Sequence, residues 1–166
     1  CFEDGDITHV EGRIDPVADA ETIETELMLA DLESVERRLT ALGKKLRGGD
    51  QEVLDQDRLL RAAQAALAEG RPARSLKIAE EDRKQWRMLQ LLTAKPVLFV
   101  CNVEEAKAAS GNSQSDRVAE MAAKQGAASV VISARIEEEL AQLPEDEAVM
   151  FLEEMGLHEA GLDRLI

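Results

Sequence analysis

The chain has 166 residues; 45% are hydrophobic but only 2% are aromatic, and its 34 acidic and 20 basic residues give a net charge of −14. Because aliphatic residues and alanine supply nearly all of the apolar content, the composition favours helices and argues against a β-sandwich or barrel, whose strands draw on β-branched and aromatic residues. The negative charge repels phosphate backbones at long range, so free DNA is not an expected partner, although a local basic patch could still contact RNA.

The cysteines and the ends of the chain indicate a reduced setting and a piece of a longer protein. Cys1 and Cys101 stand far apart, without a CxxC pair or a His-rich neighbourhood, so no metal site is expected. No apolar run approaches the ~20 residues of a membrane span and no signal peptide is recognisable, so we expect a cytoplasmic protein without a membrane partner. The chain starts with Cys rather than Met and ends on the apolar Leu165 and Ile166, so both ends are interpreted as cuts.

Residues 1–18 mix glycine, proline and charges without a sustained period and are expected to form an ordered connector; two long helices follow. The first is predicted to start at Asp19, its N-cap, and to extend for roughly 27 residues. Its apolar stripe consists of Met28, Leu32, Val35, Leu39, Leu42 and Leu46, with Ile23 and Leu27 widening it upstream. Gly48 and Gly49 end this helix, and Asp50 caps the second, which extends to about residue 70. Its apolar face carries Val53, Leu60, Ala63 and Leu67, so the two helices should form an antiparallel hairpin.

Besides the helix that connects the two strands, three shorter helices are predicted after the two long ones. The first lies near residues 79–91 and has Trp86, Leu89 and Leu92 on its buried side. Two acidic helices near residues 136–143 and 144–155 lie towards the end of the chain, where residues 156–166 should add one or two helical turns.

Between these helices lie two short, wholly apolar runs, which are typical of buried parallel strands. The first is PVLFVCN, residues 96–102, and the second is ASVVIS, residues 128–133. The helix that connects them should end near Gln125, and its N-cap is expected to be Ser113 or Ser115. A strand, helix and parallel strand in this order predict a right-handed βαβ unit.

Ligands of open α/β sheets bind beyond the carboxyl ends of parallel strands, which points to the loops that follow these two runs. Asn102 offers an amide that both donates and accepts, and Glu105 adds a carboxylate three residues later. The turn at Ser133 and Ala134 offers free backbone N–H groups. Together these groups could read the edge of a heterocycle. Spacing alone leaves a second interpretation open, because an Asn at a strand end is often only a turn-former.

Other polar residues of the sequence favour structural interpretations over catalytic ones. His9 and His158 are isolated from each other and from any Ser or Cys nucleophile pattern, so surface or capping roles are expected. The acidic runs 137–139 and 145–147 are interpreted as solvated helix faces. The sequence contains no GxxxxGK[ST] phosphate-binding motif, so it can hold at most part of a nucleotide site, and no catalytic residue is assigned.

Three separated segments of the chain resemble YchF-type, Obg-related P-loop ATPases. In order, they are CFEDGDITHVEGRIDPVADAETIETELMLADLESVERR, LLTAKPVLFVCNVEE and GLHEAGLDRLI. The resemblance covers most of the chain and leaves the hairpin tip and the polar loop around Gly111 as its variable parts.

The resemblance implies a helix-rich α/β fold: part of a P-loop NTPase domain with a Rossmann-like parallel sheet and an inserted antiparallel coiled-coil hairpin. Residues 1–18 would be the connector from the nucleotide domain, 19–92 the inserted hairpin, and 93–166 the second half of the NTPase domain. The family's phosphate loop, Mg²⁺-binding threonine and DxxG-like motif would lie before the first residue, and its TGS domain would lie after the last. Catalytic residues therefore cannot be carried over.

The resemblance also implies how a base would be read. The family's NKxD-like motif becomes NxxE here, so Asn102 would contact the base, Val103 would cover it, and Glu105 would replace the aspartate that selects guanine. Ser133 and Ala134 stand at the fifth motif, where backbone groups meet the base edge. Arg135 departs from the small residue found in many relatives.

The implied function is hydrolysis of ATP in preference to GTP by the full-length parent, with Mg²⁺ as its metal. The parent would be a ribosome-associated regulator of translation or stress responses that contacts the large subunit, and this chain alone would be inactive. A different class remains open, in which the chain is a non-catalytic acidic helical hairpin that docks a protein partner.

Overall fold

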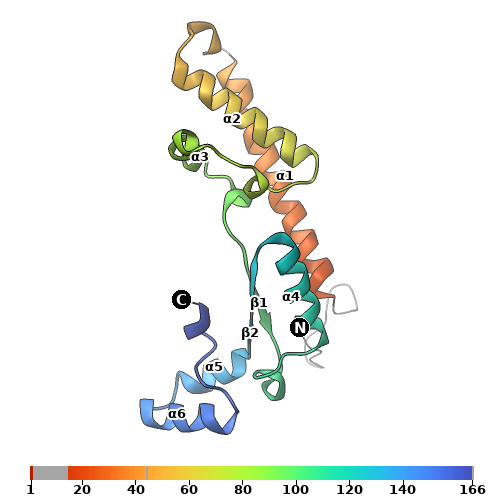
Figure 1. The fold of residues 1–166 in the computed structure, drawn as a ribbon, viewed down its shortest axis with the longest axis vertical. Coiled ribbons are helices and arrows are strands. Elements are labelled where there is room, and N and C mark those ends of the chain that lie inside the picture. The colour runs from red at the N-terminus through yellow and green to blue at the C-terminus, as the bar shows by residue number, and fades with distance from the viewer. Residues whose placement is uncertain (2–14, 44, 166) are drawn as a thin grey trace. The chain divides into compact units, whose positions relative to one another are not determined.

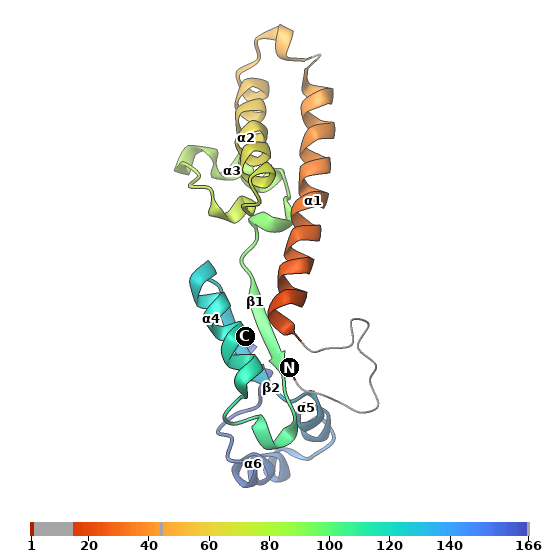
Figure 2. The ribbon, with the colours of Figure 1, turned by 90° about the vertical axis from the view of Figure 1, so that its right-hand side faces the viewer.

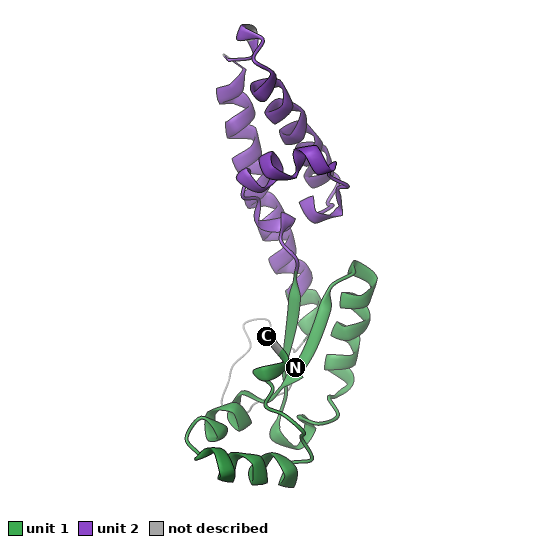
Figure 3. Cartoon of the chain, turned by 60° about the vertical axis from the view of Figure 1, so that its left-hand side comes forward, with its two compact units in different colours: residues 1–19, 97–166 green, residues 20–96 purple. Residues whose placement is uncertain are grey.

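The computed structural model describes residues 1, 15–43 and 45–165 (Figure 1). Most of the expected connector, including His9, lies outside these residues. The chain divides into two compact units, shown in Figure 3: unit 1 comprises residues 1–19 and 97–166, and unit 2 comprises residues 20–96. Helices predominate and the sheet has two parallel strands, which confirms a helix-rich α/β class. Within the described residues, no helix is long and apolar enough to cross a membrane.

Helix α1 extends over Pro16–Leu42 and begins earlier than predicted. Its N-cap is Asp15 rather than Asp19, because the Asp15 carboxylate accepts a hydrogen bond from the Ala18 N–H at 3.4 Å. Proline suits the first helical position, where its fixed φ matches the helix and the missing N–H would have had no helical partner. Asp19 instead lies in the first turn of α1, where its negative charge interacts favourably with the helix dipole and stabilises the helix.

Helix α2, Gln51–Ala68, begins where the sequence predicts. Asp50 is its N-cap, and its side chain accepts from the Glu52 N–H at 3.0 Å. A short 3₁₀ turn, Leu46–Gly48, precedes it, so α1 ends a turn earlier than the stripe suggests. The two helices lie side by side and run in opposite directions (Figure 2).

The core of unit 2 is built from the predicted apolar faces of α1 and α2. Its buried members from these helices are Val35, Leu42, Leu59, Leu60, Ala63 and Leu67, and Met28, Leu32, Leu39 and Val53 pack against them. Ile23 and Leu27, which were expected to widen the stripe, are exposed instead. The apolar stripe of α1 is therefore narrower at its N-terminal end than the spacing predicts.

The third predicted helix is shorter than its sequence pattern. After a 3₁₀ turn at Glu80–Asp82, helix α3 covers Arg83–Met88, and Gln90 then takes a left-handed backbone conformation with φ 52°. This turn breaks the helical period, so Leu91 is buried at 3% exposure whereas Leu92, predicted to be buried, is 43% exposed. Leu89 is buried, as predicted.

A buried carboxylate joins α1 to the end of unit 2. Asp31 is 3% exposed and accepts from the Leu92 N–H at 2.8 Å, the Thr93 N–H at 2.8 Å and the Thr93 hydroxyl at 2.7 Å. The Thr93 hydroxyl in turn accepts from the Ala73 N–H at 3.1 Å. Three segments that are distant in the sequence thus share one saturated network, in which each donor has a partner.

Unit 1 contains the predicted βαβ unit. Strand β1, Leu98–Asn102, pairs in parallel with β2, Ala128–Ile132, and α4, Ser113–Gln125, connects them. The N-cap of α4 is Asn112 rather than either predicted serine, because its carboxamide accepts from the N–H groups of Gln114 and Ser115, both at 3.0 Å. Ser115 completes a capping box by accepting from the Asn112 N–H.

Helix α4 packs against both strands and covers one face of the sheet. Its buried residues are Ser115, Val118, Met121 and Ala122, and Cys101 of β1 is also buried. Residues alternate between the two faces of a strand, and Leu98 and Val100 remain 44% and 46% exposed. The second face of the sheet is therefore open at these positions.

The last part of unit 1 is a pair of short helices, α5, Ala134–Leu140, and α6, Glu145–Glu154, followed by a 3₁₀ turn at Asp163–Leu165. Their core contains Ala108, Ile136 and Leu157, against which Leu140, Phe151, Leu152 and Met155 pack. The Glu137 carboxylate accepts from the backbone N–H groups of Gly161 at 2.7 Å and Leu162 at 3.2 Å. This contact holds the final segment against α5.

Candidate nucleotide-base site

The carboxyl ends of β1 and β2 lie beside each other, as the sequence predicts. Asn102 and Ile132 are partners in the strand register. After β1, Val103 and Glu104 lead into a 3₁₀ turn at Glu105–Lys107, and after β2, Ser133 leads directly into α5. The Val103 N–H extends the pairing by donating to the Ile132 carbonyl at 2.9 Å. Two segments about thirty residues apart in the chain therefore form one edge, which we call the strand-end edge: Asn102, Val103, Glu105, Ser133, Ala134 and Arg135.

Asn102 links the two loops of the strand-end edge directly. Its Oδ1 accepts a hydrogen bond from the Ala134 N–H at 2.8 Å, and the residue is exposed. The Nδ2 amine has no hydrogen-bond partner among the described residues and can donate to a ligand. The carboxamide thus both positions the turn after β2 and presents an unused donor at the surface.

Glu105 lies on the same edge in an ion pair that the sequence analysis did not anticipate. Its carboxylate is 2.6 Å from Arg135 Nε, and the two side chains are 41% and 74% exposed, Arg135 being the more open. Arg135 also lies 3.9 Å from Glu139, one helical turn further along α5. The charge of Glu105 is therefore matched by a neighbouring cation, although the pair remains open to solvent.

The other predicted site residues differ in their accessibility. Val103 and Ser133 are buried, at 1% and 2% exposure, whereas Ala134 is exposed. Ser133 has an extended backbone and stands directly before α5. Val103 was expected to cover a base, but its side chain packs inside the protein here, so that role stays a prediction. The groups that the edge offers to a ligand are Asn102 Nδ2 and the Glu105 carboxylate. The Ala134 N–H, predicted to be free, instead donates to Asn102 Oδ1.

Strand β1, which leads into the strand-end edge, contains the buried Cys101. Burial raises the pKa of the Cys101 thiol above its ordinary value, since a buried thiolate would lose its hydration. The residue therefore behaves as an apolar core side chain near neutral pH. Within the described part of the chain, no group of three or more His, Cys, Asp and Glu side chains could hold a metal ion.

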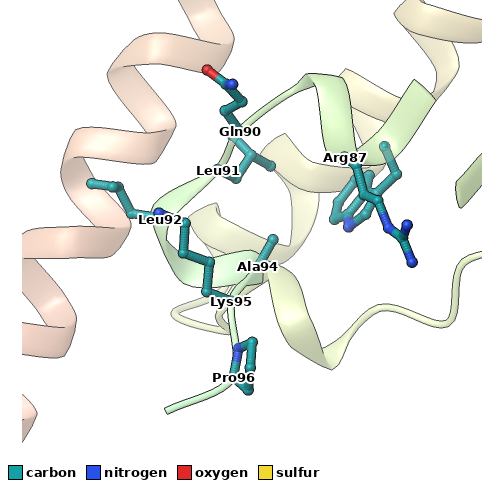
Figure 4. A pocket seen from close by; sticks show the side chains of 8 residues that line it. Arg87, Gln90, Leu91, Leu92, Ala94, Lys95 and Pro96 are labelled. Atoms are coloured by element: carbon teal, nitrogen blue, oxygen red, sulfur yellow. The ribbon is translucent and has the colours of Figure 1, made fainter. Parts of the chain in front are cut away.

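A separate cavity of about 670 Å³ lies in unit 2, at the end of α3 (Figure 4). It is lined by Trp86, Arg87, Gln90, Leu91, Leu92, Ala94, Lys95 and Pro96. None of the predicted site residues takes part in it. The cavity adjoins Gln90, whose left-handed backbone ends the helical segment. A sequence pattern that continues the helix to residue 91 therefore gives no sign of the cavity.

Two contacts were missed by sequence reasoning because each joins segments that are distant in the chain. Arg135 pairs with Glu105, and Glu137, interpreted as part of a solvated run, instead binds the backbone at Gly161 and Leu162. The remaining acidic residues of both runs are exposed, and so is His158, as predicted. Opposite charges at the ends of neighbouring strands would have been the available signal for the first contact.

Comparison with known proteins relates the whole chain to one family. No family model matches. Proteins named "Ribosome-binding ATPase YchF" from Bacillus subtilis and Haemophilus influenzae are 44% and 41% identical to it, across 100% of this chain and 46% of each relative. The solved structure of the Schizosaccharomyces pombe YchF GTPase matches 99% of this chain and 46% of its own, with a TM-score of 0.85 and 26% identity.

The chain thus spans about half the length of the curated relatives that it matches. The likeness holds in sequence and in structure over nearly every residue, and it includes the strand-end edge. Over its whole length, the chain is a close homologue of the proteins named YchF.

Proposed function

We propose that this chain supplies the base-recognition part of a P-loop nucleoside triphosphatase that prefers ATP to GTP. The observation that carries the proposal is the hydrogen bond from the Ala134 N–H to Asn102 Oδ1 at 2.8 Å, with Glu105 on the same strand-end edge. A fixed carboxamide with a free Nδ2 donor at the carboxyl end of parallel strands suits the edge of a purine.

The NxxE sequence supports the choice of adenine. A carboxylate held at this motif accepts two hydrogen bonds from guanine, at its ring N–H and its exocyclic amine. Adenine carries an acceptor at that ring position, so the same carboxylate would face it without a donor. Glu105 is one methylene longer than the aspartate of guanine-reading proteins and is held by Arg135, which leaves the base edge free of an unpaired carboxylate.

The remaining parts of the proposal follow the family. Residues 19–92 would form an inserted helical hairpin, and residues 93–166 the second half of the NTPase domain. The triphosphate and Mg²⁺ belong to the family's phosphate loop, whose motif this chain does not contain. Mg²⁺ would neutralise charge on the transferred phosphoryl group. The bacterial relatives are named ribosome-binding, so we propose a cytoplasmic ribosome-associated protein, with the large subunit as its contact.

The names of the relatives make nucleotide preference the property to test, since the bacterial proteins are called ATPases and the yeast structure a GTPase. Affinities of the full-length product of the native gene for ATP and GTP should be measured by competition against a fluorescent nucleotide with Mg²⁺ present. We expect tighter binding of ATP. Equal affinities, or tighter binding of GTP, would contradict the proposal.

A second candidate function is a non-catalytic hairpin that docks a protein partner. The exposed apolar residues Ile23 and Leu27, one turn apart on α1, favour it, because together they present an apolar surface that a partner could cover. Reversing the charge of the exposed Glu26 and Glu33 on the same helix should then abolish partner binding in a co-sedimentation assay with ribosomes. Unchanged co-sedimentation would remove this candidate.

A further inference from the structure

The ion pair between Glu105 and Arg135 places a cation against the carboxylate of the strand-end edge. The distance from Arg135 Nε to the Glu105 carboxylate is 2.6 Å, whereas Glu139, on the same helix as Arg135, is 3.9 Å away. The guanidinium therefore forms a close ion pair with Glu105 and meets Glu139 only as a more distant charge. Its contact reaches across the two strand-end loops.

A carboxylate that is occupied by Arg135 differs chemically from a free one. A free carboxylate would attract the N–H donors of guanine and repel the ring nitrogen of adenine. In the ion pair, the negative charge of Glu105 is compensated by Arg135, so guanine must compete with the guanidinium while adenine gains a neutral neighbour. Both effects disfavour guanine relative to adenine.

We propose that Arg135 is a specificity-determining residue, which holds the Glu105 carboxylate away from the base and so shifts nucleotide choice towards ATP. This inference rests on the proposed function, because it requires that Asn102 and Glu105 meet a base. Arg135 acts through Glu105 and is a positioning residue rather than a catalytic one.

The expected change in nucleotide preference is small because the ion pair between Arg135 and Glu105 is exposed to solvent. The side chains of Arg135 and Glu105 are 74% and 41% exposed, and exposed ion pairs contribute little, so Arg135→Gln should lower the ATP-to-GTP affinity ratio about two- to fivefold. Arg135→Lys keeps a cation beside Glu105 and should retain most of the ratio, although a lysine cannot reproduce the planar fork of arginine.

The test measures ATP and GTP affinities of the full-length gene product for the wild type, Arg135→Gln, Glu105→Gln and the double variant. Arg117→Gln is the matched control, because Arg117 is an exposed arginine of the same unit that pairs with Asp15 at 3.1 Å. We expect the ratio to fall in Arg135→Gln, to stay unchanged in Arg117→Gln, and to be insensitive to residue 135 once Glu105 is neutral.

Each outcome bears on a different claim. A wild type that prefers ATP, together with an unchanged ratio in Arg135→Gln, would overturn the inference and leave the proposed function intact. Equal loss of ATP and GTP affinity in Arg135→Gln would also overturn it, because it would show a general structural role. A wild type without preference would contradict the proposed function, and the shift caused by Arg135→Gln would still decide whether Arg135 restrains Glu105.

Discussion

Two carboxylates, Asp31 in unit 2 and Glu105 in unit 1, have opposite surroundings although each is bound by its neighbours. Asp31 is 3% exposed and accepts three hydrogen bonds from Leu92 and Thr93. Glu105 has a single ionic partner, Arg135, and its side chain is open to water. The first carboxylate is bound within the fold, whereas the second forms an ion pair at a solvent-exposed edge.

The difference separates stability from function. Removing a buried acceptor leaves its donors without water or a protein partner, so the free energy of unfolding bears the cost. Removing an exposed acceptor lets water replace it, and the folded state changes little. We therefore expect variants at the Asp31 network to affect folding, and variants at the strand-end edge to affect nucleotide binding.

The largest expected effect is at Asp31. Asp31→Ala should lower the free energy of unfolding by about 3 kcal/mol, because two buried donors and one partly buried donor lose their acceptor. Urea denaturation followed by circular dichroism measures this. Glu33→Ala, an exposed acid on the same helix, is the control and should change stability by less than about 0.5 kcal/mol. Equal losses of stability in Asp31→Ala and Glu33→Ala would contradict the expected difference between a buried and an exposed carboxylate.

A smaller loss is expected at Gly161, beneath the end of β2. A Cβ there would lie 2.6 Å from Ile132 Cγ2 and 2.7 Å from Glu137 Oε1, so Gly161→Ala should cost about 2 kcal/mol through overpacking. The same change should speed hydrogen exchange of the Leu162 N–H, which Glu137 binds. Gly48→Ala is the control, since no atom lies within 4 Å of its added Cβ. Unaltered exchange at Leu162 would show that the segment is not held in this way.

The smallest expected effect is on the pH dependence of stability. Burial raises the pKa of Cys101 in the folded state, so above the ordinary thiol pKa the unfolded chain loses its proton while the folded chain retains it. The stability that this thiol contributes is complete below that pH and is lost as the pH rises towards the folded-state pKa. In a Cys1→Ser background, urea midpoints should fall more steeply between about pH 8 and 10 than in Cys1→Ser/Cys101→Ala. Parallel pH profiles would contradict this expectation.

Local patterns in the sequence predict most of the secondary structure. The period of apolar residues locates α1, α2 and both strands, and the carboxylate of Asp50 identifies the start of α2. Errors arise where a competing local signal acts: Asp15 caps α1 in place of Asp19, and the left-handed Gln90 ends the period of α3. Such choices depend on a few dihedral angles, which periodicity does not report.

The candidate site is predicted in part. Strand ends and residue chemistry identify Asn102, Glu105 and Ala134, because parallel strands bring their carboxyl ends to one edge. Their contacts depend on tertiary structure: neither the hydrogen bond between Asn102 and Ala134 nor the ion pair with Arg135 has a local sequence pattern. The burial of Val103 was likewise not predictable from a local pattern, since it follows from packing around the sheet.

The most direct test compares the two asparagines of unit 1 in the full-length gene product by titration calorimetry with ATP and Mg²⁺. Asn102 bridges the strand-end edge, and Asn112 caps α4, so both variants to alanine lose a carboxamide that binds backbone N–H groups. Asn102→Ala should weaken ATP binding about tenfold, whereas Asn112→Ala should lower stability by about 1 kcal/mol and leave ATP affinity unchanged. Unchanged ATP affinity in Asn102→Ala would contradict the assignment of the strand-end edge as the base site.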